Sequence, residues 1–509
     1  MKYLFYKPFW IGNPRAAIFI DEMEIEINKD NEPILLTCNG ELIDGCVYNP
    51  IKSKLICNSC KYFRKNDLSL LSKKIKEYTI ADFIDKDKKY DKLDWNYTNT
   101  DEIQNIKYKG VEIGLASLSA YIQETRNQSP DITAQFRIFM NKLLNVAVLL
   151  TDATNNAFDI LKPDKVGVFN ARINTRRPLL NISQQRGIEC NVFEHTGFVG
   201  EFECKKVYYK NCLPQDVDYN TKLIYETWDK SDLSEQKKIE IANSFFDKKR
   251  IGISVDDKSY TKNQKPNLLP ENVDLSKRII TIFNSSDDEY ASLGKEWDYK
   301  LSKSRLTTLD AIFEYFKNKD DFHFYLRIHP NLANVKYKYV KDLEKLRKHS
   351  NLTIILPTSP INSYSLLDIS EKIITFGSTI GVEAIYNKKP AILLNTCFTM
   401  GLNVYYMPKS HNELFLMIEE NLKPKEILPV LKYAFHRISF GTKFTYFNPN
   451  PYKTNEFYIK EKLLVSFNKD YREAKYKGTL PSLINFIKYK QASIPKNLML
   501  KFNKNIIPK

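Results

Sequence analysis

The chain has 509 residues, of which 43% are hydrophobic and 27% charged, with a formal net charge of +16 at pH 7. This length allows two or three domains, and the balance of apolar and charged residues excludes a disordered or fibrous protein. No apolar run approaches the roughly 20 residues that cross a bilayer, and the first ten residues lack the apolar core of a secretory signal. We therefore expect a cytoplasmic protein whose basic charge serves an anionic partner.

Strands and helices alternate along the amino-terminal half. Strands are expected at 3–6, 34–36, 166–170 and 188–194, and helices at 16–27, 115–126, 134–150 and 178–186. Residues 62–108 are charged and irregular, with weak helical signals at 68–78 and 80–87. The alternation predicts parallel strands covered by helices, a Rossmann-like domain over 1–260 with an insertion at about 38–110.

A second α/β unit is expected after a linker. Residues 255–275 are polar, contain proline and show little periodicity, which is typical of a linker. Strands are then expected at 279–283, 324–328, 353–356, 373–376 and 391–395, with a helix at 306–317. This pattern predicts a second doubly wound domain over 261–440 that faces the first across a cleft.

A basic extension, 441–509, ends the chain. Residues 451–509 hold 13 Lys and Arg against 4 Asp and Glu, which is more than half of the net charge. Two interpretations stay open: a helix that packs back on the protein, or a peripheral contact with anionic lipid at the inner face of the cytoplasmic membrane. Nucleic acid is not expected, because no RNP-like, zinc-finger or KH signature is found.

Polar turns follow the strands of the carboxyl-terminal half. Asn284 and Ser285 follow the first strand, His329 the second, and Gly377-Ser378-Thr379 the fourth. Ligands of open parallel sheets bind at the carboxyl ends of strands, so these residues are expected at one edge. The last turn also begins an expected helix, 380–386, whose first N–H groups favour an anion. The combination indicates a phosphate site, most naturally for a nucleotide.

These motifs, in this order, resemble the nucleotide-binding half of GT-B glycosyltransferases over about 279–395. The motifs are Asn-Ser-Ser, Arg-x-His-Pro, a Ser-Pro turn and Gly-Ser-Thr-x-Gly-x-Glu-Ala. They are most similar to the bacterial capsule-polysaccharide group that includes Kdo transferases and is similar in layout to sialyltransferases. The amino-terminal half also resembles glycosyltransferase-like proteins of surface-polysaccharide clusters, through LTCNGELIDGC, ICNSC, FNARINTRR and FEHTG.

The resemblance implies a fold, an activity and contacts. It implies two Rossmann-like domains and a metal-independent transfer of sugar from a nucleotide sugar, with a CMP-linked donor favoured. The acceptor would be a surface polysaccharide, a lipid-linked glycan or a protein glycan. It further implies that His329 and Ser378, with Thr379 beside it, contact the donor nucleotide.

Two more residues are candidates for the donor site. Arg327 lies on the same side of its strand as His329, and its guanidinium fork suits a phosphate. Glu383 lies five residues beyond Ser378, about a turn and a half along the expected helix. It is either an acceptor for ribose hydroxyls or an ordinary helix-surface carboxylate.

An inverting transferase needs a general base near the acceptor hydroxyl. Glu194 and His195 end the strand at 188–194 and are the leading candidates, whereas Asp152 and Asp44 are weaker ones. Asn170 and Arg172 end the neighbouring expected strand, where they can orient the acceptor or a sugar carboxylate.

A cluster of arginines points to an anion in the same half. Arg172, Arg176 and Arg177 lie at or just before an expected helix start, where the helix dipole disfavours cations. This conflict hints at an anionic ligand, although a surface position also explains it.

Four of the eight cysteines form a separate pattern, C-x7-C-x10-C-x2-C. Four thiolates satisfy tetrahedral zinc, and such a cluster in a cytoplasmic protein is more often metal-binding or redox-active than disulfide-bonded. The first spacing is not that of a standard zinc ribbon, so structural zinc and unrelated reduced cysteines stay equally open, with an iron–sulfur cluster a distant third. The four residues are Cys38, Cys46, Cys57 and Cys60.

Other functions of the same fold stay open. A polyol-phosphate transferase, a UDP-sugar 2-epimerase and a non-catalytic scaffold that binds glycan or nucleotide are the alternatives. The two DxD sequences, at 85–87 and 216–218, follow no convincing strand, which argues against a metal-dependent GT-A transferase.

Overall fold

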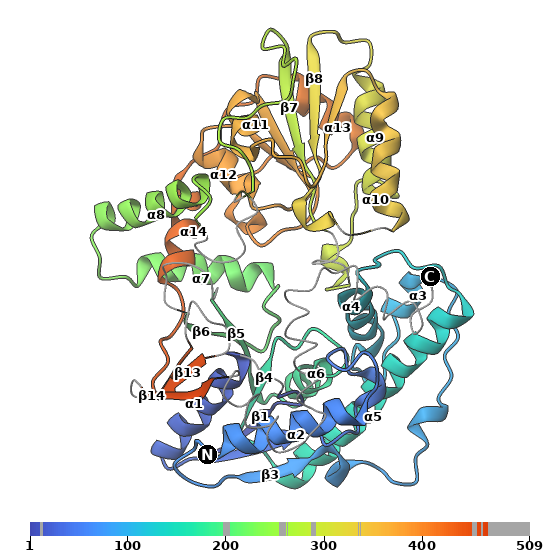
Figure 1. The fold of residues 1–509 in the computed structure, drawn as a ribbon, viewed down its shortest axis with the longest axis vertical. Coiled ribbons are helices and arrows are strands. Elements are labelled where there is room, and N and C mark those ends of the chain that lie inside the picture. Colours follow the sequence, from blue (N-terminus) through green and yellow to red (C-terminus); the bar gives the residue numbers. More distant parts are fainter. Residues whose placement is uncertain are drawn as a thin grey trace. The chain divides into compact units, whose positions relative to one another are not determined.

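The computed structural model describes residues 1–10, 14–196, 204–253, 261, 263–286, 292–333, 335, 337–449, 456–459 and 462–466. The chain divides into two compact units (Figure 1). The first comprises Met1–Phe198, Glu203–Pro214 and Gly441–Lys509, and the second comprises Val199–Phe202 and Gln215–Phe440. Each unit has its own largely parallel sheet between helices, so the expected α/β class is confirmed.

The sheet of the first unit has the strand order β3-β2-β1-β4-β5-β6. Neighbouring strands are parallel except β5 and β6, which are antiparallel. The chain therefore adds strands on one side of β1 and then crosses to the other side, which places a topological switch point between β1 and β4. The strands are β1 (Lys2–Tyr6), β2 (Glu32–Thr37), β3 (Lys76–Thr79), β4 (Lys165–Phe169), β5 (Glu189–His195) and β6 (Lys206–Lys210).

Helices of the first unit bury the central strands from both faces. Tyr3, Leu4, Phe5 and Tyr6 of β1 are each at most 1% exposed, which explains why this strand is an unbroken apolar run. The helices are α1 (Pro14–Asn28), α2 (Lys54–Leu68), α3 (Thr100–Gln104), α4 (Ile113–Thr125), α5 (Ala134–Leu161) and α6 (Arg177–Gln185).

The sheet of the second unit is wholly parallel, in the order β11-β10-β7-β8-β9. Its switch point lies between β7 and β10, because the chain adds β8 and β9 on one side of β7 before it crosses to the other. The strands are β7 (Arg278–Phe283), β8 (Phe322–Arg327), β9 (Leu352–Ile355), β10 (Lys372–Thr375) and β11 (Ala391–Leu393).

Alternate side chains of β7 enter two different cores. Ile279 and Phe283 belong to one apolar cluster, and Ile280 and Ile282 belong to the other, as the period of two in a strand requires. Figure 1 shows the two faces, with α11 and α12 on one side of the strands and α9 on the other. The helices are α7 (Val217–Asp229), α8 (Glu235–Arg250), α9 (Arg305–Tyr315), α10 (Lys338–Asp342), α11 (Ser363–Ile369), α12 (Ile380–Tyr386), α13 (His411–Glu419) and α14 (Leu428–Ser439).

The division between units differs from the boundary expected at residue 260. Trp228 of α7 and Phe245 and Phe246 of α8 join a core of the second unit, so both helices belong there. The polar segment expected as a linker is hydrogen-bonded to the second unit, because Leu268 O accepts the backbone N–H of Asn362 at 3.0 Å.

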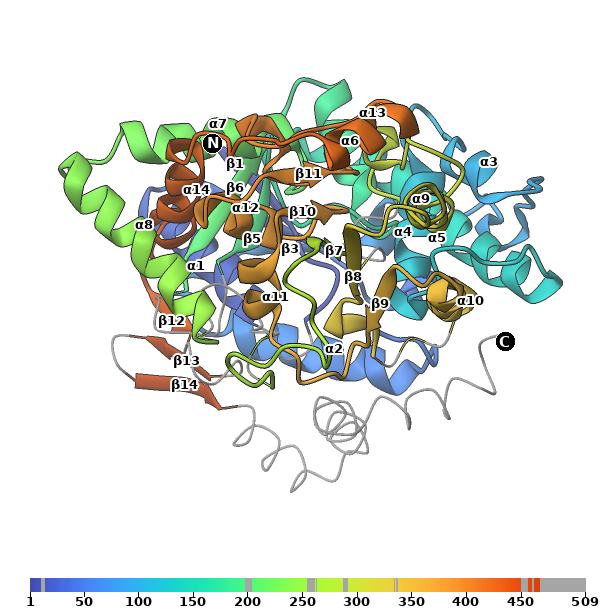
Figure 2. The same cartoon turned by 90° about the horizontal axis from the view of Figure 1, so that it is seen from above.

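Several elements were not foreseen. The edge strands β3 and β6 lie in segments with no expected strand, and β12 (Phe447–Pro449), β13 (Glu456–Ile459) and β14 (Lys462–Ser466) form a separate antiparallel sheet (Figure 2). Nearly all of the basic extension beyond 449 lies outside the described residues, and so do Asp287 and Asp288, which the sequence suggests as caps of the segment that follows the first strand of the second unit. Within the described part of the chain, no helix has the length and hydropathy needed to cross a membrane.

A buried ion cluster joins segment 445–447 to α1 and β6 within the first unit. Lys206 of β6 is fully buried, and its Nζ contacts Asp21 and, at 2.6 Å, Glu22 of α1. Asp21 also accepts the backbone N–H groups of Thr445 and Phe447, each at 3.1 Å. Lys206 thus supplies the positive charge that allows two carboxylates to be buried beneath the returning segment.

Replacing Lys206 by Met should destabilise the first unit by about 3–5 kcal/mol, because two buried carboxylates lose their cation. The measurement is urea-induced unfolding. Lys210→Met, at the exposed end of the same strand, is the control and should stay within about 0.5 kcal/mol of the parent. Equal effects of the two substitutions would contradict a special role for Lys206.

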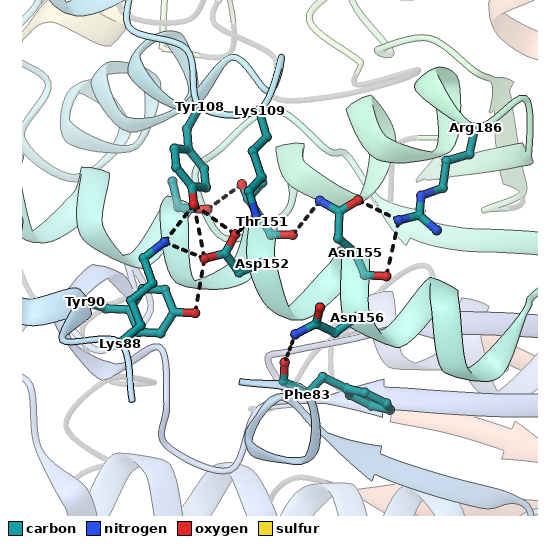
Figure 3. Close-up of polar contacts among 11 residues, drawn as sticks. Phe83, Lys88, Tyr90, Tyr108, Lys109, Thr151, Asp152, Asn155, Asn156 and Arg186 are labelled. Carbon is teal, nitrogen blue, oxygen red and sulfur yellow. Dashed lines mark hydrogen bonds and ion pairs between the residues drawn. The ribbon is translucent and has the colours of Figure 1, made fainter. Parts of the chain in front are cut away.

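Asp152 of α5 fastens the irregular segment between β3 and α4 (Figure 3). Its carboxylate pairs with Lys88 and Lys109, each at 2.7 Å, and accepts hydrogen bonds from Tyr90 at 3.2 Å and Tyr108 at 3.1 Å. Burial by itself would raise the pKa of Asp152, but the hydrogen bonds and charges of the two lysines outweigh it and lower the pKa. A carboxylate held this way is a poor proton acceptor, so the structure assigns Asp152 a fastening role instead of the base role considered from the sequence.

Asp152→Asn should destabilise the protein by about 1–3 kcal/mol, because several hydrogen bonds to a charged group are lost. Since the folded pKa of Asp152 is lowered, its contribution is present above the ordinary Asp pKa of about 3.9 and is lost as the pH falls below it. The stability difference between parent and variant should therefore shrink in acid. Asp159→Asn, an exposed position on the same helix, is the control for urea unfolding at several pH values.

Candidate functional site

Polar residues gather at the switch point of the second sheet. Ser285, just beyond β7, is 2% exposed and donates a hydrogen bond to Phe376 O beyond β10 at 2.8 Å. Gly377 follows with a φ of +108°, and a Cβ there would lie 3.0 Å from Thr396 O and 3.8 Å from the Ser285 hydroxyl. Only glycine fits this backbone and this close approach, so the loops after β7, β10 and β11 meet here.

His329 is held at the same edge by its neighbours. Its backbone N–H donates to Asn284 Oδ1 at 2.6 Å, and its Nδ1 accepts the N–H of Asn331 at 3.1 Å. The Asn331 side chain in turn donates to Ser286 Oγ at 3.0 Å. Because Nδ1 is an acceptor, the proton of the neutral ring is on Nε2, where the imidazole can act as a donor.

The start of α12 completes this edge. The N–H of Ser378 donates to Thr375 Oγ1 at 2.9 Å, and the side chains of Ser378 and Thr379 are half-buried and exposed, respectively. The structure therefore brings together six of the residues expected to bind a donor nucleotide, namely Asn284, Ser285, His329, Gly377, Ser378 and Thr379.

The other two donor-site candidates have different surroundings. Arg327 is 2% exposed and donates to Leu356 O and Ser359 O, each at 3.2 Å, so its guanidinium braces the turn after β9. Burial lowers the pKa of Arg327 to about 10. Glu383, at 4% exposure, accepts from Tyr364 Oη at 2.6 Å and pairs with Lys249 of α8 at 3.0 Å. Neither side chain joins the group around Gly377.

Glu194 and Asn170 meet at the carboxyl edge of the first sheet. Asn170 Nδ2 donates to Glu194 Oε1 at 2.6 Å. Burial raises the pKa of Glu194, and Asn170 together with the charges of Arg15 and Arg176 offsets part of the rise. A carboxylate whose pKa lies above its ordinary value is suited to accept a proton near neutral pH.

His195 and Arg172 fit their expected roles less well. Burial lowers the pKa of His195 to about 4, and its Nδ1 lies 2.8 Å from Thr196 O, so the ring is neutral and weakly basic. Arg172 is half-exposed, with its Nη2 3.4 Å from Gln123 Oε1. Of the two base candidates, Glu194 has the better chemistry.

Sequence reasoning marked only Arg176 in a second group of residues at this edge. A small pocket, with room for about one water molecule, is lined by residues from the ends of β1 and β4 and from the helices beside them. Lys7 lies inside a segment considered only as a possible signal, and no motif marks Arg15. The lining residues are Tyr6, Lys7, Pro8, Phe9, Arg15, Phe19, Phe169 and Arg176.

The four cysteines of the expected zinc site have separate partners. Cys60 Sγ accepts the N–H of Trp10 at 3.2 Å, Cys38 Sγ accepts that of Gly40 at 3.3 Å, and Cys57 Sγ lies 3.5 Å from Asn49 Nδ2. Burial raises the pKa of Cys60 to about 12. Across the described ranges, no three His, Cys, Asp or Glu residues are grouped closely enough to hold a metal; the residues considered for zinc were Cys38, Cys46, Cys57 and Cys60.

No protein-family model matches the chain, and no curated protein matches its sequence. Solved structures with a similar fold include KpsC of Thermosulfurimonas dismutans, a beta Kdo 2,4 transferase. It is 13% identical with a TM-score of 0.36, and the alignment covers 53% of this chain and 79% of that chain. They also include UDP-GlcNAc 2-epimerase from Neisseria meningitidis, which is 12% identical with a TM-score of 0.24. That alignment covers 89% of this chain and 96% of the epimerase chain.

Proposed function

We propose that the protein is a GT-B glycosyltransferase that moves a sugar from a nucleotide donor to a glycan acceptor. The observation that carries the proposal is the position of the polar residues. In each unit they gather beside the switch point of the parallel sheet, where this class of fold binds ligands.

The second unit would bind the donor. His329 can donate from Nε2, and Ser378 and Thr379 offer hydroxyls, while Gly377 leaves room for a phosphate to approach the backbone. These groups are neutral, so they can hold a phosphate by hydrogen bonds without the charge of a metal ion. A CMP-linked sugar is the favoured donor, on the resemblance of the motifs.

The first unit would bind the acceptor and supply the base. Glu194, held by Asn170, would accept the proton of the acceptor hydroxyl as that oxygen attacks the anomeric carbon and the nucleotide leaves. The acceptor would be a surface polysaccharide, a lipid-linked glycan or a protein glycan. Assembly at the cytoplasmic face of a membrane is part of this proposal, with the basic extension beside anionic lipid.

A nucleotide screen tests the donor site. One nucleotide among CMP, CDP, UDP and GDP should raise the melting temperature, since a ligand at 100 times its Kd adds about 2.7 kcal/mol. His329→Ala should abolish most of this shift. His323→Ala, at the other end of β8 and bonded to Thr353 at 2.9 Å, is the matched control and should retain it. No shift with any nucleotide or its sugars would contradict a donor site here.

Glu194→Gln tests the base. Turnover should fall by about 10²–10⁴-fold, while nucleotide binding is unchanged. Because the base works only when ionised, the parent's activity should decline as the pH falls through a pKa above the ordinary Glu value of about 4.3. The variant should lack this acid limb. His195→Ala is the comparison, and a larger loss there than in Glu194→Gln would reverse the assignment.

Product analysis separates the transferase from an epimerase of the same fold. A transferase releases nucleotide only when acceptor is present, whereas a UDP-sugar 2-epimerase converts its substrate without an acceptor.

A further inference from the structure

A buried asparagine at the carboxyl edge of the second sheet has an unused amide. Asn395, two residues beyond β11, is 8% exposed, and its buried Nδ2 has no hydrogen-bond partner among the described residues. Buried polar groups are nearly always paired, and an unpaired donor destabilises the folded chain. The amide therefore calls for an explanation that lies outside the packing of the protein.

The position of Asn395 is fixed by the pairing of β10 with β11. The two strands are parallel neighbours (Figure 2), and Thr375 stands opposite Leu393. Two residues further along each chain, the same register sets Asn395 opposite Gly377. A Cβ on Gly377 would lie 3.0 Å from Thr396 O, so the two segments are in contact there.

The alternation of side chains places Asn395 on the side of the sheet that α12 covers. Leu393 and Cys397 belong to the apolar cluster that includes residues of α12, whereas Leu394 belongs to the cluster on the other face. Asn395 lies between the first two in the same alternate series, so we expect its side chain on the α12 side, near the start of that helix.

A second unused group lies at this corner. Thr379 is the residue that precedes α12, and its hydroxyl makes no capping hydrogen bond, although threonine commonly caps helices. Thr379 is exposed and Ser378 is half-buried, so solvent reaches this part of the edge. A ligand at Gly377 would therefore meet hydrogen-bonding groups from the loops after both β10 and β11.

Neighbouring hydroxyls in the loop after β11 are paired within the chain. Thr396 Oγ1 donates to Glu296 O at 2.5 Å, and Thr399 Oγ1 lies 2.7 Å from Tyr405 Oη. The loop is thus well ordered by its own hydrogen bonds, and poor local packing does not explain the unpaired amide of Asn395.

We propose that Asn395 is a further binding residue for the sugar donor, and that its amide donates a hydrogen bond to an oxygen of the donor's phosphate. The inference rests on the proposed function, which places that phosphate at Gly377. The missing side chain of Gly377 lets the phosphate approach the backbone, and Asn395 lies directly beside this position. Because no hydrogen bond holds Nδ2 among the described residues, the amide can turn toward the ligand about its side-chain torsions without breaking one.

The assignment implies opposite effects on stability and on binding. An asparagine that serves the fold stabilises it, whereas an unpaired asparagine kept for a ligand destabilises the empty protein. Asn395→Leu, which keeps the size of the side chain and removes its polar atoms, should raise the melting temperature of the unliganded protein by about 2–4 °C. The same substitution should weaken the binding of nucleotide.

Calorimetric titration of the full-length protein with CMP and cytidine, and with UDP and uridine, tests the contact. Asn395→Leu should weaken the nucleotide that binds the parent about tenfold or more and leave its nucleoside unchanged, because the nucleoside has no phosphate. Asn395→Asp should weaken the nucleotide further, since a carboxylate repels the phosphate. Asn395→Ala repeats the binding test if the leucine variant does not fold.

Two results would overturn the contact. Nucleotide affinity that stays at the parent's value in the leucine or aspartate variant would show that the amide does not donate to the phosphate. An equal loss for nucleotide and nucleoside would place the contact on the ribose or the base.

Asn351 is the matched control. It is also 8% exposed and lies just before β9, at the opposite edge of the same sheet, but its Nδ2 is paired, with Phe313 O at 3.1 Å. Asn351→Leu should lower the melting temperature, because Phe313 O loses this donor, and should leave nucleotide affinity unchanged. An equal fall in melting temperature for Asn351→Leu and Asn395→Leu would show that Asn395 is structural and would overturn the proposal.

The contact and the donor site can fail separately. Nucleotide binding in the parent that Asn395→Leu does not weaken would overturn only the contact. A parent that binds none of the nucleotides would overturn the donor site of the proposed function, and the contact with it.

Discussion

Both candidate sites depend on one topological constraint: the first strand of each sheet is paired on both sides with parallel strands. β1 lies between β2 and β4, and β7 lies between β8 and β10. The connections from the two sides run away from each other, so the loops at the carboxyl end of the first strand leave room for a ligand. This constraint explains why Lys7, Asn284 and Gly377, which no single motif joins, all lie at such positions.

The two sheet edges differ in the charge of the side chains that they carry. Around Gly377 the groups are hydroxyls, an amide and an imidazole, and the backbone N–H groups of His329 and Ser378 donate to Asn284 and Thr375. Around Phe169 the groups are the cations Arg15 and Arg176, whose charges act on the buried carboxyl of Glu194.

The same unit shows what a buried cation needs when no ligand is involved. Lys206 has two carboxylates within contact, and the returning segment 445–447 supplies their remaining hydrogen bonds. Asp152 has the converse arrangement, one carboxylate with two lysines and two tyrosines. Arg176 differs from both, because its charge acts on the buried carboxyl of Glu194 while its hydroxyl partner is Tyr48.

Much of the fold could be predicted because buried parallel strands are apolar runs. IITIF and the segment that becomes β10 are such runs, and polar turns end them, so the edge with His329 and Ser378 follows from the sequence. The edge strand β3 is KEYT, half charged and half-exposed or exposed, and carries no such signal. The helices α7 and α8 are amphipathic on their own, and only packing decides which unit their aromatic residues join.

Charged residues at strand ends were harder to predict, as two arginines show. Arg327 and Arg176 are both buried beside a strand end or helix start, and each has an Nε–H without a partner among the described residues. Carbonyl oxygens of the turn after β9 accept hydrogen bonds from both terminal nitrogens of Arg327. Arg176 instead donates to Tyr48 and lines the same small pocket as Arg15 and Lys7. The loops that surround each arginine come from distant parts of the chain. Residue type and spacing therefore do not tell whether a buried arginine stabilises a turn or contacts a ligand. The distinction is one of contacts: backbone carbonyls stabilise the buried guanidinium of Arg327, whereas the charge of Arg176 acts on the buried carboxyl of Glu194.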